Sequence, residues 1–399
     1  MKKIIILIFL ISNSFNAQIL DEKDRAQKIN EILKYRFENI LPDLMDKTDI
    51  DMWVLISREY NEDPVLKTML PAEWLNARRR TILVFYRNKE NNSLDKLAVA
   101  RYNFGENIIS AWDKESQPNQ WLRLNEIIEE RNPKKIGLNF SKYFNIADGL
   151  DKTDYDEFMS NISSLNKKKI VSAQKLATAW IETRTTQEME IYKQIVTITK
   201  QIINEAFSTS VIQIGKTTTT DLEWWMRQKV TDLGLETWFH PSVDIQRSSE
   251  INGDHLRSFS NRPSENIIQR GDLLHCDFGI TYLRLNSDCQ QMAYILNDNE
   301  KDVPYYLKEA FKDANQLQDI LTSNFLHGNS GNEILLNSLK EAKKELIELK
   351  EENKELKEML EKFAEKTGKE NPEDLPLNTK AAIAKAEGLG RNPPCWPKG

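Results

Sequence analysis

The sequence predicts an α/β amino-terminal domain, followed by an α+β domain and a helical coiled-coil tail. Short apolar runs rich in β-branched residues alternate with helical patterns over residues 18–175, as in an α/β domain with a mixed sheet. Two amphipathic helical segments precede a hairpin-like stretch within residues 176–336, which predicts the α+β domain. Apolar residues recur at spacings of three and four over residues 337–368, which predicts the coiled coil.

The residues before the first domain have the pattern of a signal peptide, residues 1–17. Lys2 and Lys3 precede an unbroken apolar run at 4–11, and the small residue Ala17 precedes a glutamine. A basic start, a short apolar core and a small residue at the cut are typical of secretory signals, so we expect a secreted or periplasmic protein. The apolar run is too short to cross a bilayer, and we expect no membrane span elsewhere.

Composition narrows the classes of partner. The formal net charge is −6 with acidic and basic residues interspersed, which argues against a nucleic-acid partner. Three cysteines cannot provide a disulfide framework for a chain of this length. About 380 residues follow the signal peptide, enough for two or three domains.

The amino-terminal domain carries no chemical motif of its own. Its apolar residues alternate between strand and helix periods, and Pro133 ends one of the helices. We expect strands at 52–56, 81–86, 97–102, 135–139 and 169–172, and helices at 25–41 and 121–130.

The second domain is predicted to begin with two helices. Residues 186–207 place apolar side chains at helical spacing, so they predict a long amphipathic helix. Thr220 and Glu223 have the spacing of a capping box, which predicts that the next helix starts there, and Gly234 supplies its end.

Residues 271–296 predict a two-stranded hairpin, because two apolar, β-prone halves flank a polar centre of turn length. With the turn centred on residues 282–283, Asp277 and Asp288 occupy mirror-related positions, with both carboxylates on one side. Two carboxylates inside an apolar sheet are costly unless a positive group neutralises them, and a divalent cation does so through carboxylate oxygens. The pattern therefore predicts a metal site; a pair of rim or turn aspartates is the alternative.

Two further features of the hairpin follow from strand alternation. His275 shares the face of Asp277, either as a group that supports the metal site or as a packed strand histidine. Cys276 and Cys289 lie at mirror positions on the opposite face, where a cross-strand disulfide and two buried free thiols are equally compatible with the sequence.

Three short motifs occur in order: Arg-Gly-Asp-Leu-Leu, then Asp-Phe-Gly at Asp277, then Asn-Ser-Asp ending at Asp288, eleven residues later. Asp-Phe-Gly also occurs in protein kinases, but the glycine-rich loop and the other kinase motifs do not accompany it. The combined pattern resembles the start of the metal site in the pita-bread metallopeptidases, family M24, which includes methionine aminopeptidase, Xaa-Pro aminopeptidase, prolidase and creatinase. Residues 18–175 are similar to the amino-terminal domain of the creatinase and prolidase branch.

The resemblance implies a partial pita-bread fold for residues 176–336 and a metal-dependent peptidase chemistry. Asp277 and Asp288 would be metal ligands for a divalent ion such as Mn, Co, Zn or Fe. The ligand or substrate would be a peptide with a free amino terminus, often one whose next residue is proline. Active relatives place a substrate-contacting histidine three residues before a proline, and Ser260 stands at that position here. His240 and His255 are the candidates to replace it, or they are ordinary polar contacts.

The resemblance is predicted to stop at residue 336. The family next supplies a histidine and two glutamates on later strands, whereas His327 falls in a turn and no histidine follows it in this sequence. Residues 337–368 instead predict a coiled coil with Asn353 at a core position, which favours a homo-oligomer. Residues 369–399 are a tail rich in proline and glycine.

Two functions are compatible with these observations. The first is an Xaa-Pro aminopeptidase-type metallopeptidase, impaired or inactive because only two of five expected ligands are present. The second is a secreted, non-catalytic module that binds peptides and is oligomerised by its coiled coil.

Overall fold

The computed structural model describes residues 19–247 and 266–367. The predicted signal peptide, His255, Ser260 and the tail after residue 368 lie outside these residues. None of the helices in the described ranges combines the length and the hydrophobicity needed to cross a bilayer.

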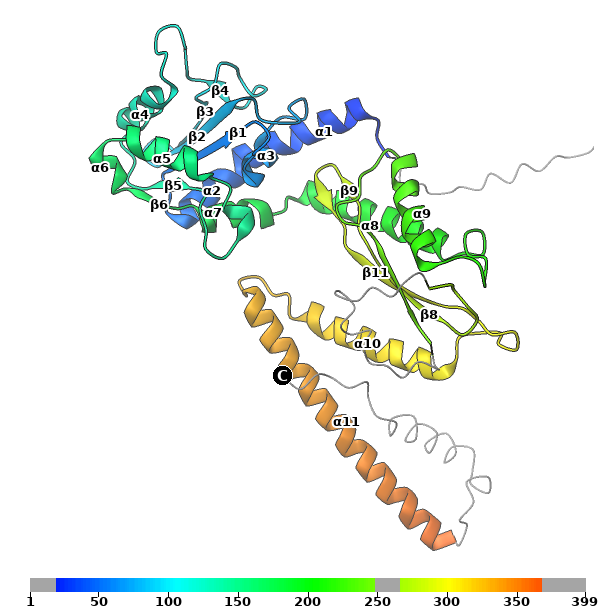
Figure 1. Cartoon of the computed structure of the whole chain (residues 1–399). Helices are drawn as coiled ribbons and strands as arrows, with labels where there is room; N and C mark the ends of the chain where they lie inside the picture. The colour runs from blue at the N-terminus through cyan, green and yellow to red at the C-terminus, as the bar shows by residue number, and fades with distance from the viewer. Residues whose placement is uncertain (1–18, 248–265, 368–399) are drawn as a thin grey trace, which may run out of the picture. The chain divides into compact units, whose positions relative to one another are not determined.

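The amino-terminal region is built on a six-stranded mixed sheet with the strand order β4-β3-β2-β1-β5-β6 (Figure 1). Its central strand β1 pairs antiparallel with β2 and parallel with β5, so both of its edges are hydrogen-bonded, and nearly every residue in it is buried. The strands are β1 (Met52–Arg58), β2 (Arg80–Asn88), β3 (Ser93–Ala98), β4 (Ile109–Ser110), β5 (Ile136–Leu138) and β6 (Ile170–Ser172).

Helices cover both faces of this sheet, and strand alternation decides which side chain meets which layer. Trp53 and Leu55 of β1 pack with the first, second, third and seventh helices, whereas Met52, Val54 and Ile56 pack with the fourth and fifth. The helices are α1 (Glu22–Tyr35), a π-helix (Arg36–Ile40), α2 (Leu41–Thr48), α3 (Pro64–Met69), α4 (Gln120–Arg131), a 3₁₀ turn (Asn145–Ala147), α5 (Lys152–Asn161), α6 (Ser164–Lys167) and α7 (Gln174–Glu182).

The second region places two helices against a small sheet. Helix α8 (Thr186–Ala206) starts with a capping box between Thr185 and Glu188, and α9 (Thr219–Asp232) starts with one between Thr218 and Asp221. The three-stranded sheet has the order β11-β8-β7, and a two-stranded ribbon β9-β10 extends its hairpin. The strands are β7 (Ser242–Gln246), β8 (Leu273–Phe278), β9 (Thr281–Tyr282), β10 (Leu285–Asn286) and β11 (Cys289–Tyr294).

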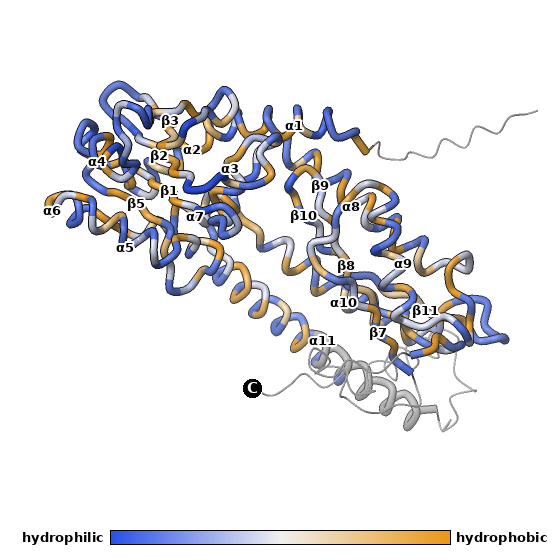
Figure 2. The backbone as a smooth tube through the Cα atoms, turned by 45° about the horizontal axis from the view of Figure 1, so that its top comes forward, coloured by the Kyte–Doolittle hydropathy of each residue, from blue (hydrophilic) through white to orange (hydrophobic). Residues whose placement is uncertain are grey.

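The chain divides into two compact units, residues 1–293 and 294–399. In the second unit, α10 (Tyr305–Ser323) and α11 (Gly331–Thr367) form a helical hairpin, held in part by a hydrogen bond of 2.7 Å from Gln316 Nε2 to Glu345 Oε2. Figure 2 shows hydrophobic and hydrophilic residues alternating along the described part of α11. A single long helix therefore occupies 331–367; its pairing as a coiled coil and the predicted domain boundaries stay predictions.

Most predicted elements are confirmed, and three are corrected at their ends. The third strand is Ser93–Ala98 rather than 97–102, so the prediction overlaps it only at Leu97 and Ala98; Val99 makes one more hydrogen bond to the Ile82 carbonyl of β2, at 2.8 Å, before the chain turns away. Helix α9 begins at Thr219 and is capped by Thr218 rather than by Thr220, since Thr218 accepts the amide of Asp221. The segment predicted as one helix at 25–41 is a longer helix interrupted by the π-helical turn at Arg36–Ile40.

Candidate metal centre

Asp277 lies near the end of β8, a strand whose alternate residues face different surroundings. Leu274, Cys276 and Phe278 are fully buried, and Cys276 Sγ lies 3.8 Å from Met226 Sδ of α9. The side chains between them are only half-buried, so Asp277 projects from the open face of the sheet.

Asp288 reaches Asp277 because the two arms of the hairpin approach closely at Gly279. A Cβ atom on Gly279 would lie 2.2 Å from the carbonyl oxygen of Ser287, so only glycine fits there. The indole of Trp238 donates to the same carbonyl at 2.7 Å, and the Ser287 hydroxyl lies 2.7 Å from the hydroxyl of Thr199 on α8. These contacts fix the chain directly before Asp288.

The hairpin turn is centred on Leu283 and Arg284 rather than on residues 282–283 as predicted. Tyr282 pairs with Leu285, and both central residues have positive φ, 51° and 64°. This is the backbone combination that matches the twist of a two-residue hairpin, although it normally selects glycine or asparagine. The prediction was wrong here because neither residue carries that signal.

The hairpin brings Asp277 and Asp288 together as predicted, close enough for Asp288 to raise the pKa of the Asp277 carboxyl. Burial raises the pKa of the Asp277 carboxyl above its ordinary value, and the neighbouring Asp288 raises it further, while His275 lowers it. Asp277 Oδ1 is buried and has no hydrogen-bond partner among the described residues, whereas Asp288 is exposed. Among the described residues, His275 is the group that acts against the rise in the pKa of Asp277.

His275 lies between two polar side chains on the same open face. Its Nε2 is 3.1 Å from Gln290 Oε1 of β11, and its Nδ1 is 3.9 Å from Asp244 Oδ2 of β7. Asp244 stands directly opposite His275 in the β7–β8 register. Asp244 is not among the predicted site residues, and only the alternation of polar and apolar residues at 242–245 signals that it shares this face.

His240 is placed away from the aspartate pair by its contacts. Its Nε2 is 3.5 Å from Glu223 Oε2 and its ring lies 5.2 Å from that of Trp224, both on α9. No contact between His240 and either aspartate occurs in the described ranges, and its role as a substrate contact stays a prediction. The other candidate, His255, lies outside those ranges, and His327 lies in the turn before α11, as predicted.

Cys276 and Cys289 carry free thiols. Burial raises the pKa of the Cys276 thiol to about 12, and the charge of Asp277 acts in the same direction. Burial also raises the pKa of Cys289. Of the two open interpretations, the structure therefore has free thiols rather than a disulfide.

The residues at the centre fit one cation better than two. A buried carboxylate oxygen without a partner, beside a second carboxylate, is the kind of donor set that a hard divalent cation satisfies. In residues 19–247 and 266–367, however, no group of three or more histidine, cysteine, aspartate or glutamate side chains is arranged to hold a metal. The described residues thus provide a two-carboxylate half-site.

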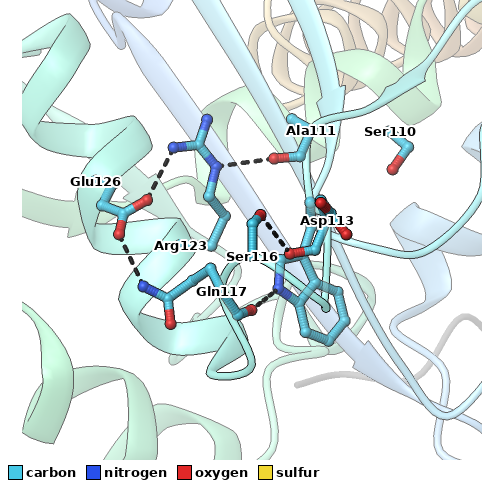
Figure 3. Close-up of a pocket in the computed structure, with 8 residues that line it drawn as sticks. Ser110, Ala111, Asp113, Ser116, Gln117, Arg123 and Glu126 are labelled. Atoms are coloured by element: carbon cyan, nitrogen blue, oxygen red, sulfur yellow. Dashed lines mark hydrogen bonds and ion pairs between the residues drawn. The ribbon is translucent and has the colours of Figure 1, made fainter.

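A separate pocket in the amino-terminal region carries no comparable chemistry. It has a volume of about 460 Å³ and is lined by residues that include Trp112, Asp113, Gln117 and Arg123 (Figure 3). Arg123 is its only lining cation and already pairs with Glu126 at 2.9 Å, so the pocket offers no unpaired cation to a ligand.

Comparisons with known proteins give one family-model match and several similar folds. Residues 190–369 match the family model described as metallopeptidase family M24. Among solved structures, the chain is similar to the X-Pro aminopeptidase from Thermotoga maritima MSB8, with 14% identity, 76% of this chain and 78% of that chain covered, and a TM-score of 0.53. It is also similar to a candidate aminopeptidase P from Bacillus anthracis, with 12% identity, 80% and 75% covered, and a TM-score of 0.50. No curated protein matches the chain.

The structural similarity at these identities shows a common fold. The family match begins at residue 190 and continues to residue 369, past residue 336, where the resemblance was predicted to stop. The predicted break at 336 is therefore not confirmed, because α11 lies within the matched region.

Proposed function

We propose that the chain is a metal-dependent aminopeptidase-like protein of the Xaa-Pro aminopeptidase type, and the match of residues 190–369 to the model of metallopeptidase family M24 supports this proposal. Its ligand or substrate would be a peptide with a free amino terminus. We further propose that turnover is weak or absent, because only Asp277 and Asp288 are assigned as metal ligands.

The contact between Asp277 and Asp288 is the observation that carries this proposal. Two carboxyl groups on adjacent strands raise each other's energy when both are ionised, and the buried oxygen of Asp277 lacks a partner among the described residues. A bound divalent cation would supply Lewis acidity and a water of lowered pKa. The chain's own contribution is to hold both carboxylates on the open sheet face and to keep His275 beside them through Gln290.

The second candidate is a secreted or periplasmic module that binds peptides without cutting them and assembles through residues 337–368. It is favoured by the two-carboxylate half-site, since hydrolysis in a dinuclear centre needs further ligands. The predicted signal peptide supports the location, and the apolar spacing along α11 supports the homo-oligomer.

Metal content per chain distinguishes the two candidates. We expect elemental analysis of protein purified without chelator to find close to one divalent ion per chain, and Asp288→Ala to reduce it at least tenfold. Asp232→Ala, at an exposed position on α9, is the matched control and should retain the metal. Release of an amino-terminal residue from an Xaa-Pro peptide by the metal-loaded protein would then show that the half-site is catalytic.

Absence of metal from both the wild-type protein and the Asp288→Ala variant would contradict the metallopeptidase proposal. A peptide that binds equally well to both proteins in that case would favour the non-catalytic module.

A further inference from the structure

The edge strand β11 lacks the features that usually keep sheet edges from pairing. It lies at the end of the β11-β8-β7 order, so its outer side has no strand partner in the described part of the chain. Its six residues, Cys-Gln-Gln-Met-Ala-Tyr, include no charge, proline or glycine. Natural edges are normally protected by charged residues, proline, bulges or short length.

The opposite edge of the same sheet is protected. On β7 the Glu223 side chain accepts the amide of Val243 at 3.0 Å, and Asp244 adds a charge to the strand. In the six-stranded sheet the edge strands β4 and β6 have only two and three residues. Among the described sheets, β11 therefore combines length, neutrality and an open edge.

We infer that β11 pairs edge to edge with β11 of a second copy of this chain, antiparallel about a two-fold axis. The backbone of the two strands would supply the hydrogen bonds, as in other additions of a strand to a sheet edge. The pair would be isologous, because each copy contributes the same surface.

The side chains of β11 favour a second copy over a different partner. The amides of Gln290 and Gln291 each donate and accept hydrogen bonds, so they are complementary to themselves across a two-fold axis. Because the strand is uncharged, self-pairing meets no like-charge repulsion, and no charge on it selects an oppositely charged partner.

The geometry of antiparallel pairing also predicts where the two half-sites lie. Gln290 and Met292 are exposed on the open face, next along the chain from Asp288. Antiparallel addition about a two-fold axis perpendicular to the sheet keeps this face of both copies on the same side. The two aspartate pairs would then share one face of a continuous six-stranded sheet.

Sedimentation velocity of the full chain in reducing buffer, over a range of concentrations, tests the inference. The wild-type protein should form a dimer, and Met292→Lys should raise its dissociation constant at least tenfold by placing like charges across the axis. Gln246→Lys, an exposed position on the protected strand β7, adds the same charge to the same sheet and should leave the dimer unchanged.

A mixture of two variants distinguishes loss of the β11 interface from a folding defect. Met292→Lys and Met292→Glu should each be monomeric, and mixing them should restore the dimer through opposite charges, which misfolded chains would not do. A monomeric wild-type protein would overturn the inference. So would a dimer that survives Met292→Lys and is lost in Leu346→Lys, because α11 would then hold the copies together.

Discussion

The Asp277 carboxylate has a buried oxygen without a hydrogen-bond partner among the described residues. A buried polar atom without a hydrogen-bond partner typically costs about 1–3 kcal/mol, so such atoms are rare in folded proteins and need an explanation. Asp277 Oδ1 is one of two such side-chain atoms in the described ranges; the other, on Asp154, lies 3.3 Å from the guanidinium of Arg58. No lysine or arginine within residues 19–247 and 266–367 forms an ion pair with Asp277, which is why a bound metal is the explanation that we propose.

The buried thiol of Cys276 gives a pH-dependent prediction. Its pKa of about 12 lies three units above the ordinary value, so at pH 8 it should form on the order of a thousandfold less thiolate than a free cysteine. Since the thiolate is the reactive form, alkylation of Cys276 by iodoacetamide should stay negligible up to pH 9, when followed by peptide mass spectrometry.

Cys289 provides the internal comparison for this prediction, because it is only partly buried and should be alkylated faster than Cys276. Rapid modification of Cys276 in the native protein at pH 8 would show that β8 is not packed against α9 as described. In urea-unfolded protein, iodoacetamide should modify both cysteines at similar rates.

At the scale of elements, the start of α8 depends on a buried ion pair. Arg36 Nη1 donates to both Glu188 carboxylate oxygens at 3.1 and 3.0 Å and to the Thr183 carbonyl at 2.7 Å. Glu188 also accepts the backbone amide of Thr185, which completes the capping box. One carboxylate therefore joins the π-helical turn of the first region to the first helix of the second.

Removal of one partner of the buried Arg36–Glu188 pair should lower the free energy of unfolding much more than loss of an exposed ion pair. Glu188→Ala leaves the Arg36 charge buried and uncompensated, so the free energy of unfolding should fall by about 3–5 kcal/mol in urea titrations. Glu190→Ala, which breaks an exposed pair with Lys193 on the same helix, should change it by less than about 1 kcal/mol. Equal losses in the two variants would contradict the buried-pair argument.

Element identity was largely predictable from the sequence, whereas element ends were not. Strands β1 and β2 and helix α8 have periodicity strong enough to identify them. The start of α9 was misplaced because a run of threonines at 217–220 offers several possible caps. The hairpin turn was misplaced because Leu283 and Arg284 adopt left-handed conformations without a glycine to signal them.

The site was predictable only to the extent that local spacing determines it. Asp277 and Asp288 follow from the mirror pattern of one hairpin. The neighbours of His275 come from two other strands, Asp244 on β7 and Gln290 on β11, and pairing between strands depends on the folded register. The alternation at 242–245 indicates which face Asp244 occupies, but it does not indicate which residue of β8 lies opposite.

At the scale of the molecule, Arg284 ties the hairpin to the amino-terminal region. Its guanidinium donates to the carbonyls of Leu70 and Pro71, which follow α3, at 2.6 and 3.3 Å. Charged donors on backbone carbonyls are stronger than neutral ones, and here they hold the hairpin turn between β9 and β10.

Arg284→Ala should weaken the attachment of the hairpin to the amino-terminal region without unfolding either of them. We expect amides of β9 and β10 to exchange with deuterium at least tenfold faster, as measured by mass spectrometry. Opening of the hairpin would no longer have to break these hydrogen bonds, so its free-energy cost would be lower. Arg101→Ala, at an exposed position of the amino-terminal region, should leave the exchange unchanged. Unchanged exchange in Arg284→Ala would mean that the hairpin is held by its own packing.

The hydrogen bond from the amide of Leu20 to the hydroxyl of Tyr282 spans 262 positions of the chain at 3.0 Å. A ribosome adding about 5–20 residues per second needs roughly 15–50 s between these two residues. Throughout that interval the leading segment has no docking partner at the hairpin. Translation order therefore makes the attachment of Leu20 to the hairpin a late step, because Tyr282 is synthesised long after the strands of the first sheet.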